Sequence, residues 1–550
     1  MTRQMLLLSL CFFFLTGISY PQENEEANYS RDLGNKESRK EWLKDAGFGM
    51  FIHFGMDSQL GIVISHSLVN ATDNYVNRYI HELPATFNPT AFNPEKIAQL
   101  AKMAGMKYVV FTTKHHSGFC MWDTRTTDFN IMNTPYGKDL LKEYVQAVRN
   151  EGLGVGFYYS PEDFHFLYEN GQIIRRREWQ EALTPALRDK YHAYIRAQCR
   201  ELMTNYGDVD VFFLDGEFEE PAKETAWEIQ PDVLVTRGAL ETPEQTVPGN
   251  IRHEAWESNL TMGTQWQFKP TNENYKDGTR LLEILIEVRA KGGAMLLNIG
   301  PKPDGSIPVP QENRLREIAA WHFINGESIH DVRPWIVSHE NDIWFTRYKT
   351  NNTVYAFLLN QKNWDLGERR EFVFRSLKTT PETKISVLGQ LGKVLEYFPE
   401  VDPKTTYDQY DDSLVVSVMR AQRIYNNKKW PNPLVLKLEQ VEPTMVPPKV
   451  GTKEVTIQDN SAVVTMDVQD IGDASAVRLG VKYRIYPGFV EQLYHQQWAY
   501  SEDMLQVDAP GEYKITIDGL EEQAPYQFQT VARRGKIEIG GNIIQKEVGE

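Results

Sequence analysis

The chain has 550 residues, which exceeds the size of one hydrophobic core and predicts about two to four domains. Hydrophobic residues make up 41% and charged residues 24%, as in ordinary globular proteins, and the 12% of aromatic residues suits both large cores and the binding of sugar rings. The net charge of −16 argues against nucleic acid or an anionic membrane as a partner.

Residues 1–19 have the pattern of a secretory signal. Arg3 precedes an almost wholly apolar run, Met5 to Leu15, and Gly17 and Ser19 then place small residues two apart. No later stretch approaches the ~20 apolar residues of a membrane span. We therefore expect a chain without membrane insertion that is secreted or periplasmic, or lysosomal in a eukaryote, with a polar leader over 20–41.

The two cysteines beyond the predicted signal, Cys120 and Cys199, lie in no metal-binding spacing. One disulfide between them is conceivable. However, Cys199 falls in a predicted amphipathic helix over 190–206, where it is expected to be a small buried hydrophobe. A cysteine nucleophile is therefore disfavoured.

Between residues 42 and 335, short apolar runs alternate with helical stretches. The predicted strands lie at 48–53, 107–113, 153–159, 209–214, 232–236 and 294–299, and the helices at 94–104, 138–150 and 190–206. This alternation indicates parallel βα units, and its length favours a closed barrel over an open doubly wound sheet. The fold class is therefore expected to be α/β, with a catalytic (β/α)8-like TIM barrel over 42–335.

After residue 335 the helical pattern stops and period-two alternation begins. It covers 343–359, 371–377, 414–419 and 434–438, and it predicts a β-sandwich over 336–445. Pro443, Pro447 and Pro448 mark a linker. A further small all-β domain is expected over 446–550, where strands at 476–486 and 511–520 resemble a fibronectin type III module.

Polar residues follow the predicted strands at their carboxyl ends, which is where an α/β barrel carries its catalytic groups. In chain order they are His53, then Lys114 with His115 and His116, then Tyr159 with Ser160, then Asp215, then Arg237. A single core histidine or Asp-Gly turn has an ordinary structural explanation. Five consecutive strand ends that carry such groups favour a functional site.

Two carboxylates and a cluster of neutral hydrogen-bonding groups at a barrel mouth indicate glycoside hydrolysis. One carboxylate attacks or assists at the anomeric carbon, and the other protonates the leaving oxygen. Asp215 is the candidate for the first, and Glu244 and Glu257 are the candidates for the second. Glu217 and Glu219, which are nearest to Asp215 in sequence, are expected to orient neighbours or to face solvent.

A metal-dependent hydrolase is the rival use of these histidines. His115 and His116 are adjacent, so they cannot both point the same way from one strand, and His53 has no HxH partner. We therefore expect neither a metal nor an organic cofactor.

Over about residues 42–335 the chain resembles the α-L-fucosidases of glycoside hydrolase family 29. The shared motifs are GMFIHFG (49–55), AGMKYVV (104–110), KHHSGFCMWD (114–123), FLDGE (213–217), WE (256–257), KGGAMLLNIGPKPDG (291–305) and NGESI (325–329). The resemblance is specific because several separate motifs keep the family's order.

The resemblance implies a retaining exo-α-L-fucosidase whose partner is a fucosylated glycan. The family's Asp-Gly motif implies a nucleophile at Asp215. Its Trp-Glu motif implies the general acid/base at Glu257, and Glu244, in a ThrProGlu element, is the alternative. The sugar-binding residues implied at matching positions are His53, His115, His116, Trp122, Tyr159, Phe213, Arg237 and Trp266.

Several departures from the family bear on the sugar. Ser117 replaces the acid of the KHHDGF motif, Ala294 replaces the usual Asn, and Phe213 stands where many members have Trp. The Glu-Trp motif that many members place after the first strand is absent, because residues 65–79 read SHSLVNATDNYVNRY. There are two alternatives to α-L-fucoside hydrolysis. One is a glycosidase that acts on another 6-deoxy or galacto-configured sugar, and the other is a non-catalytic carbohydrate-binding protein.

Overall fold

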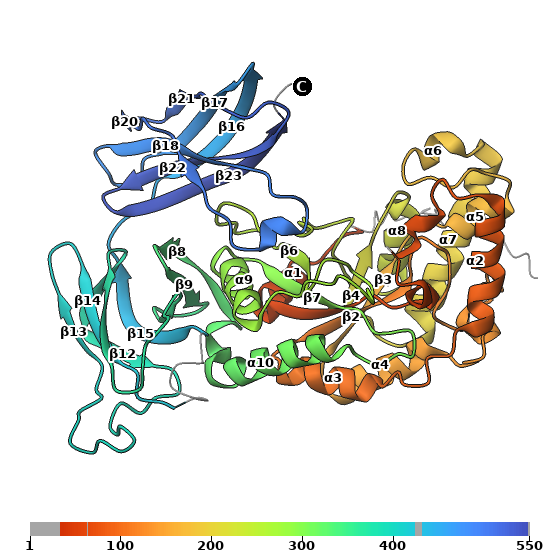
Figure 1. Ribbon diagram of the computed structural model, residues 1–550, viewed down its shortest axis with the longest axis horizontal. Coiled ribbons are helices and arrows are strands. Elements are labelled where there is room, and N and C mark those ends of the chain that lie inside the picture. Colours follow the sequence, from red (N-terminus) through yellow and green to blue (C-terminus); the bar gives the residue numbers. More distant parts are fainter. Residues whose placement is uncertain (1–32, 63, 424–431, 548–550) are drawn as a thin grey trace, which may run out of the picture. The chain divides into compact units, whose positions relative to one another are not determined.

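The computed structural model describes residues 33–62, 64–423 and 432–547 (Figure 1). The predicted signal and most of the predicted leader lie outside these residues. Across the described ranges, every helix is too short or too polar to span a bilayer. The chain from Gly34 onward forms a single unit by its internal contacts.

A parallel sheet of seven strands, in the order β5-β4-β3-β2-β1-β7-β6, occupies the first part of the chain. Its strands are β1 (Phe48–Ile52), β2 (Tyr108–Lys114), β3 (Gly154–Tyr159), β4 (Val211–Leu214), β5 (Leu234–Val235), β6 (Glu257–Thr261) and β7 (Ala294–Ile299). Apart from Gly154, every residue in these strands is buried. Continuous apolar runs suit such strands because both faces of the sheet are covered.

The described residues contain seven strands of this sheet, whereas a complete (β/α)8 barrel has eight. The outer strands are β5 and β6. Between them, Glu241 and Glu244 form single parallel bridges to Trp256 and Asn259 on the β6 side. Pro243 lies between the two bridging glutamates and has no N–H to donate, which interrupts a continuous ladder. The α/β class is as predicted, with a curled parallel sheet.

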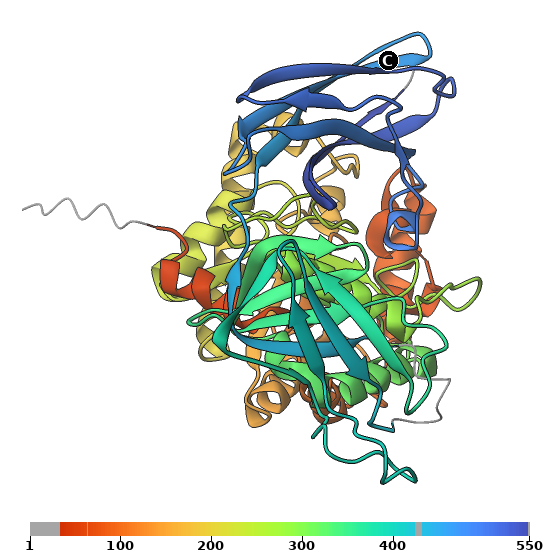
Figure 2. The same cartoon turned by 90° about the vertical axis from the view of Figure 1, so that its left-hand side faces the viewer.

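Helices lie between the strands and cover the sheet (Figures 1 and 2). They are α1 (Glu37–Ala46), α2 (Asp73–Thr86), α3 (Pro94–Met103), α4 (Leu140–Asn150), α5 (Phe164–Glu169), α6 (Trp179–Ala182), α7 (Pro185–Asn205), α8 (Glu219–Ile229), α9 (Gly278–Ala290) and α10 (Val309–Asn325). The starts of α3, α4, α7 and α9 are fixed by side chains that accept a backbone N–H, from Asn93, Asp139, Thr184 and Asp277. Helix α1 begins inside the predicted leader.

The side chains of each strand alternate between an inner cluster and an outer cluster that faces the helices. Along β4, Val211 and Phe213 join the inner cluster, and Phe212 and Leu214 join the outer one. Because the alternation has a period of two, the next residue, Asp215, continues the inner series. The two cysteines are free and buried in the outer cluster.

After α10 and η4 (Gly326–Ser328), the chain is mainly β-structure in two parts, each with its own core. The first part has sheets β12-β15-β10-β9-β8 and β11-β14-β13, and the second has β16-β17-β21 and β19-β18-β22-β23, with β20 paired to β18. The strands of the first part are β8 (Val332–Glu340), β9 (Ile343–Tyr348), β10 (Val354–Leu358), β11 (Arg369–Phe374), β12 (Leu377–Val387), β13 (Thr406–Gln409), β14 (Leu414–Met419) and β15 (Leu434–Pro443). Those of the second part are β16 (Lys449–Gln458), β17 (Ser461–Asp470), β18 (Val477–Ile485), β19 (Ala499–Tyr500), β20 (Leu505–Val507), β21 (Gly511–Ile517), β22 (Pro525–Arg534) and β23 (Ile537–Glu547).

Two histidines near the amino-terminal end of the sheet form a pair whose protonation affects stability. His330 Nδ1–H donates to the carbonyl of Ala46 at 2.8 Å, so its Nε2 accepts from His322 Nε2–H, also at 2.8 Å. Burial lowers the pKa of His322 to about 4, and burial together with His322 lowers that of His330 to about 3. The pair is therefore held neutral.

Replacing this pair by His322→Gln and His330→Asn should make the protein less sensitive to acid. Unfolded histidine titrates near ~6.5, so the pair's contribution is complete above that pH and is lost as the pH falls toward the folded pKa values. The wild type should lose on the order of 5 kcal/mol more than the variant between about pH 7 and about pH 4.5. Thermal unfolding of both proteins at the two pH values measures this, and equal shifts would contradict it.

Candidate active site

Asp215 stands directly after β4 and is held by two donors. Tyr158 O–H donates to Asp215 Oδ2 at 2.8 Å, and Arg237 Nη1–H donates to Oδ1 at 2.9 Å. The following Gly216 has φ +115°, and a Cβ there would lie 2.7 Å from Glu162 side-chain atoms. The turn therefore requires glycine, and it fixes where the carboxylate points.

Asp215 is ionised although it is largely enclosed. Burial by itself raises the pKa of Asp215, but the charge of Arg237 and the hydrogen bonds from Tyr158 and Arg237 outweigh it and hold that pKa well below its usual range. The side chain is still 20% exposed. An ionised carboxylate that a ligand can reach is suited to act as a nucleophile.

Arg237, which follows β5, connects two carboxylates. Its Nη1 binds Asp215, and its Nη2–H donates to Glu244 Oε2 at 2.8 Å. The Glu244 side chain is 30% exposed, and the guanidinium carbon lies 5.0 Å from the centroid of the Phe213 ring. Two carboxylates thus lie on either side of one guanidinium at the carboxyl end of the sheet.

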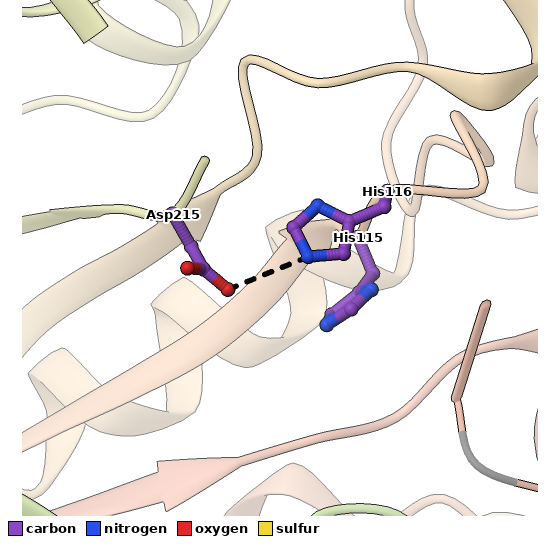
Figure 3. A group of neighbouring side chains, drawn as sticks. All are labelled: His115, His116 and Asp215. Atoms are coloured by element: carbon purple, nitrogen blue, oxygen red, sulfur yellow. Dashed lines mark ion pairs between the residues drawn. The ribbon is translucent and has the colours of Figure 1, made fainter. Parts of the chain in front are cut away.

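Three histidines gather beside Asp215. His116 Nε2 lies 3.6 Å from Asp215 Oδ2, and the His115 ring meets the His116 ring edge-on at 4.3 Å between centroids (Figure 3). The His53 ring is 6.0 Å from that of His115. Burial lowers the pKa of His53 to about 4 and the pKa values of the other two well below their usual range. Neutral imidazoles can each donate and accept one hydrogen bond, as recognition of hydroxyl groups requires.

The prediction that His115 and His116 cannot point the same way is wrong, because they follow β2 rather than lie in it. A bulge between Thr112 and Lys114 shifts the alternation at the end of this strand. Lys114 consequently turns outward and forms a fully buried ion pair with Asp163 at 3.0 Å. Removing one partner of such a pair costs about 3–5 kcal/mol, so the pair is a firm anchor for the histidine loop.

The ligand atoms of His115, His116 and Asp215 lie within 4.8 Å of one another, a grouping that could accept a metal ion. Two guanidinium groups oppose this. Arg237 is bonded to Asp215, and the charge of Arg176, after burial, contributes to the lowered pKa values of both histidines. Fixed positive charges repel a cation, so the grouping better suits a neutral ligand that carries hydroxyls.

Aromatic rings line the same region. The Trp266 ring lies 5.0 Å from that of His53, and the Phe213 ring stacks on Tyr158 at 5.6 Å. Flat rings beside hydrogen-bonding groups are the combination that binds a sugar, whose C–H faces pack on the rings.

The stretch that lacks the family's Glu-Trp motif also reaches this site. Its first residues lie in η2 (Ile64–Leu68), where Ser65 is fully buried. Ser65 Oγ lies 2.6 Å from His115 Nδ1, and the His66 ring stacks on His116 at 5.7 Å with 15° between planes. A hydroxyl and an imidazole thus lie beside the two histidines.

Two predicted sugar-binding residues lie on the outer side of the sheet instead. The Tyr159 hydroxyl donates to Gln198 at 2.8 Å, and the Trp122 indole N–H donates to Glu201 at 3.0 Å, both on α7. Strand residues alternate between faces, so Tyr158 occupies the inner position that was expected for Tyr159.

Glu257 is also not brought to Asp215. It is the first residue of β6 and lies opposite Ala294, the first residue of β7, at the amino-terminal end of the sheet. The four residues that separate this level from the carboxyl end span roughly 13 Å. Glu257 is fully buried, accepts a hydrogen bond from Tyr108, and has its pKa raised to about 7 by burial.

The loop after β3 supplies one residue that the sequence interpretation missed, Glu162, together with Ser160, which it named as a strand-end group. Glu162 is almost fully buried, contacts Arg176, and has its pKa raised to about 7 by burial. Ser160 Oγ lies 2.6 Å from His116 Nδ1. The sequence did carry an indication of Glu162, because residues 160–163 read Ser-Pro-Glu-Asp directly after a predicted strand.

A sequence model described as Alpha-L-fucosidase matches residues 17–327. The plasma alpha-L-fucosidase of Rattus norvegicus is 27% identical over 421 residues, which cover 70% of this chain and 89% of that protein. The tissue alpha-L-fucosidase of Mus musculus is 30% identical over 403 residues, 64% of this chain and 83% of its own length. The solved structure of alpha-L-fucosidase isoenzyme 1 from Paenibacillus thiaminolyticus has a TM-score of 0.61 at 28% identity and covers 74% of this chain and 99% of that chain.

Proposed function

The chain belongs to the alpha-L-fucosidase family of glycoside hydrolases, and from this premise we propose that it removes terminal α-L-fucosyl residues by double displacement, with Asp215 as the nucleophile. The observation that carries the proposal is the ionised Asp215 at a strand end, bonded to Arg237 and Tyr158. Asp215 attacks the anomeric carbon and forms a glycosyl-enzyme, which water then hydrolyses.

Glu244 is our candidate for the general acid/base. It shares Arg237 with Asp215 and is partly exposed, whereas Glu257 is fully buried at the other end of the sheet. Since an acid must carry a proton, Glu244 has to leave Arg237 when the substrate enters, while Arg237 remains on Asp215. In a retaining enzyme the two carboxyl groups then lie ~5–5.5 Å apart, on the two sides of the scissile bond.

Glu162 is a third carboxyl group near the nucleophile, and we assign it a positioning role. Its raised pKa would suit an acid, but its side chain is only 2% exposed. One oxygen accepts the backbone N–H of Glu217 at 3.1 Å, and the other contacts Arg176. A carboxyl group so enclosed is better placed to fix its neighbours than to meet a leaving oxygen.

The sugar is proposed to lie among His53, His115 and His116, against Trp266 and above Phe213. Neutral imidazoles on several sides can match a ring with hydroxyls on adjacent carbons. Ser65 and His66 occupy the stretch without the Glu-Trp motif, which favours a related 6-deoxy or galacto-configured glycoside as the second candidate substrate.

A panel of chromogenic aryl glycosides tests the function. It contains the α-L-fucoside, the α-L-rhamnoside, and the α- and β-D-galactosides. The fucoside should have the highest kcat/KM, and NMR of the first product should show the α anomer, as expected for retention. Preference for another glycoside would support the second candidate, and hydrolysis of none would indicate a carbohydrate-binding protein.

Further proposals concern architecture and export. The bridges from Glu241 and Glu244 to the β6 side support a (β/α)8-like barrel. The sheets β16-β17-β21 and β19-β18-β22-β23 support a fibronectin type III-like module.

The pattern of residues 1–19 supports export of the protein. Protein recovered from the medium or periplasm should then begin after Ser19, which amino-terminal sequencing checks.

A further inference from the structure

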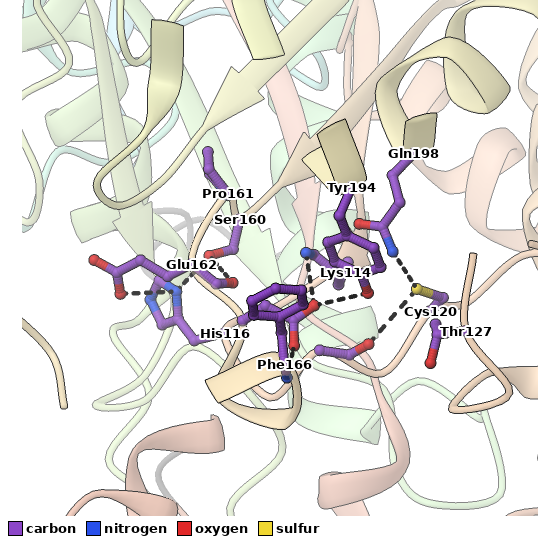
Figure 4. Close-up of polar contacts among 12 residues, drawn as sticks. Lys114, His116, Cys120, Thr127, Ser160, Pro161, Glu162, Phe166, Tyr194 and Gln198 are labelled. Atoms are coloured by element: carbon purple, nitrogen blue, oxygen red, sulfur yellow. Dashed lines mark hydrogen bonds and ion pairs between the residues drawn. The ribbon is translucent and has the colours of Figure 1, made fainter. Parts of the chain in front are cut away.

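His116 lies between the nucleophile and the loop that follows β3. Its Nε2 is 3.6 Å from Asp215 Oδ2 (Figure 3). On the other side of the ring, Nδ1 is 2.6 Å from Ser160 Oγ and 3.6 Å from Glu162 Oε2 (Figure 4). All of these neighbouring atoms are oxygens, so the position of the imidazole proton decides what the ring can bind.

The hydrogen bonds of Ser160 determine that position. Its hydroxyl donates to the carbonyl of Glu162 at 3.0 Å, and a serine has only one proton to give. Ser160 Oγ must therefore accept at 2.6 Å, which requires a proton on His116 Nδ1. Since burial keeps the ring neutral, Nε2 has no proton and presents a lone pair.

His116 Nε2 and Asp215 Oδ2 are consequently two acceptors that face each other at 3.6 Å. Asp215 Oδ2 accepts a hydrogen bond from the Tyr158 hydroxyl, so that proton does not lie between Asp215 and His116. A group placed against both acceptors must bring its own proton, and a hydroxyl does so. With Asp215 attacking the anomeric carbon, the nearest sugar hydroxyl is the one on the adjacent carbon, the 2-hydroxyl.

We propose that Ser160 is a positioning residue that holds His116 as the Nδ1–H tautomer, so that His116 Nε2 accepts a hydrogen bond from the 2-hydroxyl of the substrate. The role of the 2-hydroxyl rests on the proposed function, whereas the tautomer does not. Hydrogen bonds to this hydroxyl strengthen in the transition state of glycoside hydrolysis, so Ser160 acts on kcat through His116.

A second histidine of the site is held in the same way, which supports the inference independently. The Asn298 amide nitrogen donates to the Trp266 carbonyl at 2.5 Å, so its Oδ1 accepts from His53 Nδ1–H at 2.7 Å. His53 Nε2 is then also an acceptor.

Ser65 provides a matched control. Its Oγ lies 2.6 Å from His115 Nδ1, the same distance that separates Ser160 Oγ from His116 Nδ1, so Ser65→Ala removes a similar contact from the neighbouring histidine.

The tautomer is measured directly by NMR of the full chain labelled with ¹⁵N at its 12 histidines. The His116 signals, assigned by their loss in His116→Gln, should show a protonated Nδ1 and an unprotonated Nε2 near neutral pH. Ser160→Ala should lose this preference, whereas Ser160→Thr and Ser65→Ala should keep it. A wild-type His116 protonated at Nε2, or at both nitrogens, overturns the proposal whether or not the chain cleaves fucosides.

The link to the substrate is measured with an aryl α-L-fucoside and its 2-deoxy counterpart. The ratio of their kcat/KM values should fall about tenfold in Ser160→Ala, the size of one lost hydrogen bond, through kcat rather than KM. Ser160→Thr should restore the ratio, and Ser65→Ala should leave it unchanged. An unchanged ratio in a folded Ser160→Ala enzyme overturns the role of Ser160. If the wild type hydrolyses no fucoside, that result counts against the proposed function. The tautomer of His116 can still be measured by NMR in that case.

Discussion

Replacing Asp215 by alanine should lower kcat for an aryl α-L-fucoside by about 10⁴-fold or more, because no glycosyl-enzyme can form without the nucleophile. Asp215 is the carboxylate that Arg237 and Tyr158 hold ionised at the strand end. The fold should survive, since the Arg237 left behind still pairs with Glu244. Steady-state kinetics and thermal unfolding of the variant measure the two effects separately.

A neighbouring carboxylate provides the control for Asp215→Ala. Glu220 has a side chain 71% exposed and pairs with Lys223 on the surface of α8. Glu220→Gln removes a negative charge from the same segment and should retain the wild-type kcat, because an exposed ion pair contributes little. If folded Asp215→Ala enzyme turned over as fast as Glu220→Gln, Asp215 would not be the nucleophile.

The position of Asp215 could be predicted because it depends on two simple regularities. A parallel sheet gathers the carboxyl ends of its strands at one edge, and the apolar run before Asp215 marks where β4 ends. The same reasoning places His53 after β1 and Arg237 after β5. The structure bonds Arg237 to Asp215 and places the His53 ring 5.5 Å from that of Tyr158, which is itself bonded to Asp215. Buried strands carry this information in their composition alone, even where they are as short as β4 and β5.

The face on which a side chain lies could not be predicted in the same way. Tyr158 and Tyr159 are adjacent and chemically identical, and only the pairing of Tyr158 with Phe213 shows which one faces inward. At the end of β2, one bulge turns Lys114 outward and brings both following histidines to the site. Nothing in the residue types around Lys114 announces that bulge.

Glu257 shows a different limit of prediction: the sequence does not show at which end of a strand a residue lies. Residues 238–256 contain no regular strand or helix in the described structure, so their sequence gives no marker for where β6 begins. A glutamate beside a tryptophan at that border could fall at either end of the strand. The structure places it at the start, next to the hydroxyl of Tyr108.

Glu244→Ala should lower kcat/KM about 10²- to 10⁴-fold for substrates whose leaving groups need protonation, and less for activated aryl fucosides. Glu244 is the carboxylate held on the second nitrogen of Arg237. Azide should restore turnover of an activated fucoside, because it attacks the glycosyl-enzyme without needing a general base. Glu257→Gln is the comparison variant, since it keeps the acceptor for Tyr108 and lies at the far end of the sheet.

The products formed with azide separate the two carboxylates by stereochemistry. In Asp215→Ala, azide takes the place of the nucleophile and attacks the substrate directly, so the fucosyl azide has inverted, β configuration. In Glu244→Ala, azide attacks a β-linked glycosyl-enzyme after the first inversion, so the product is the α-azide. The two variants should therefore yield opposite anomers, which proton coupling constants distinguish. Rescue of Glu257→Gln with the α-azide, and none for Glu244→Ala, would move the acid/base role to Glu257 and require a rearranged β6 during catalysis.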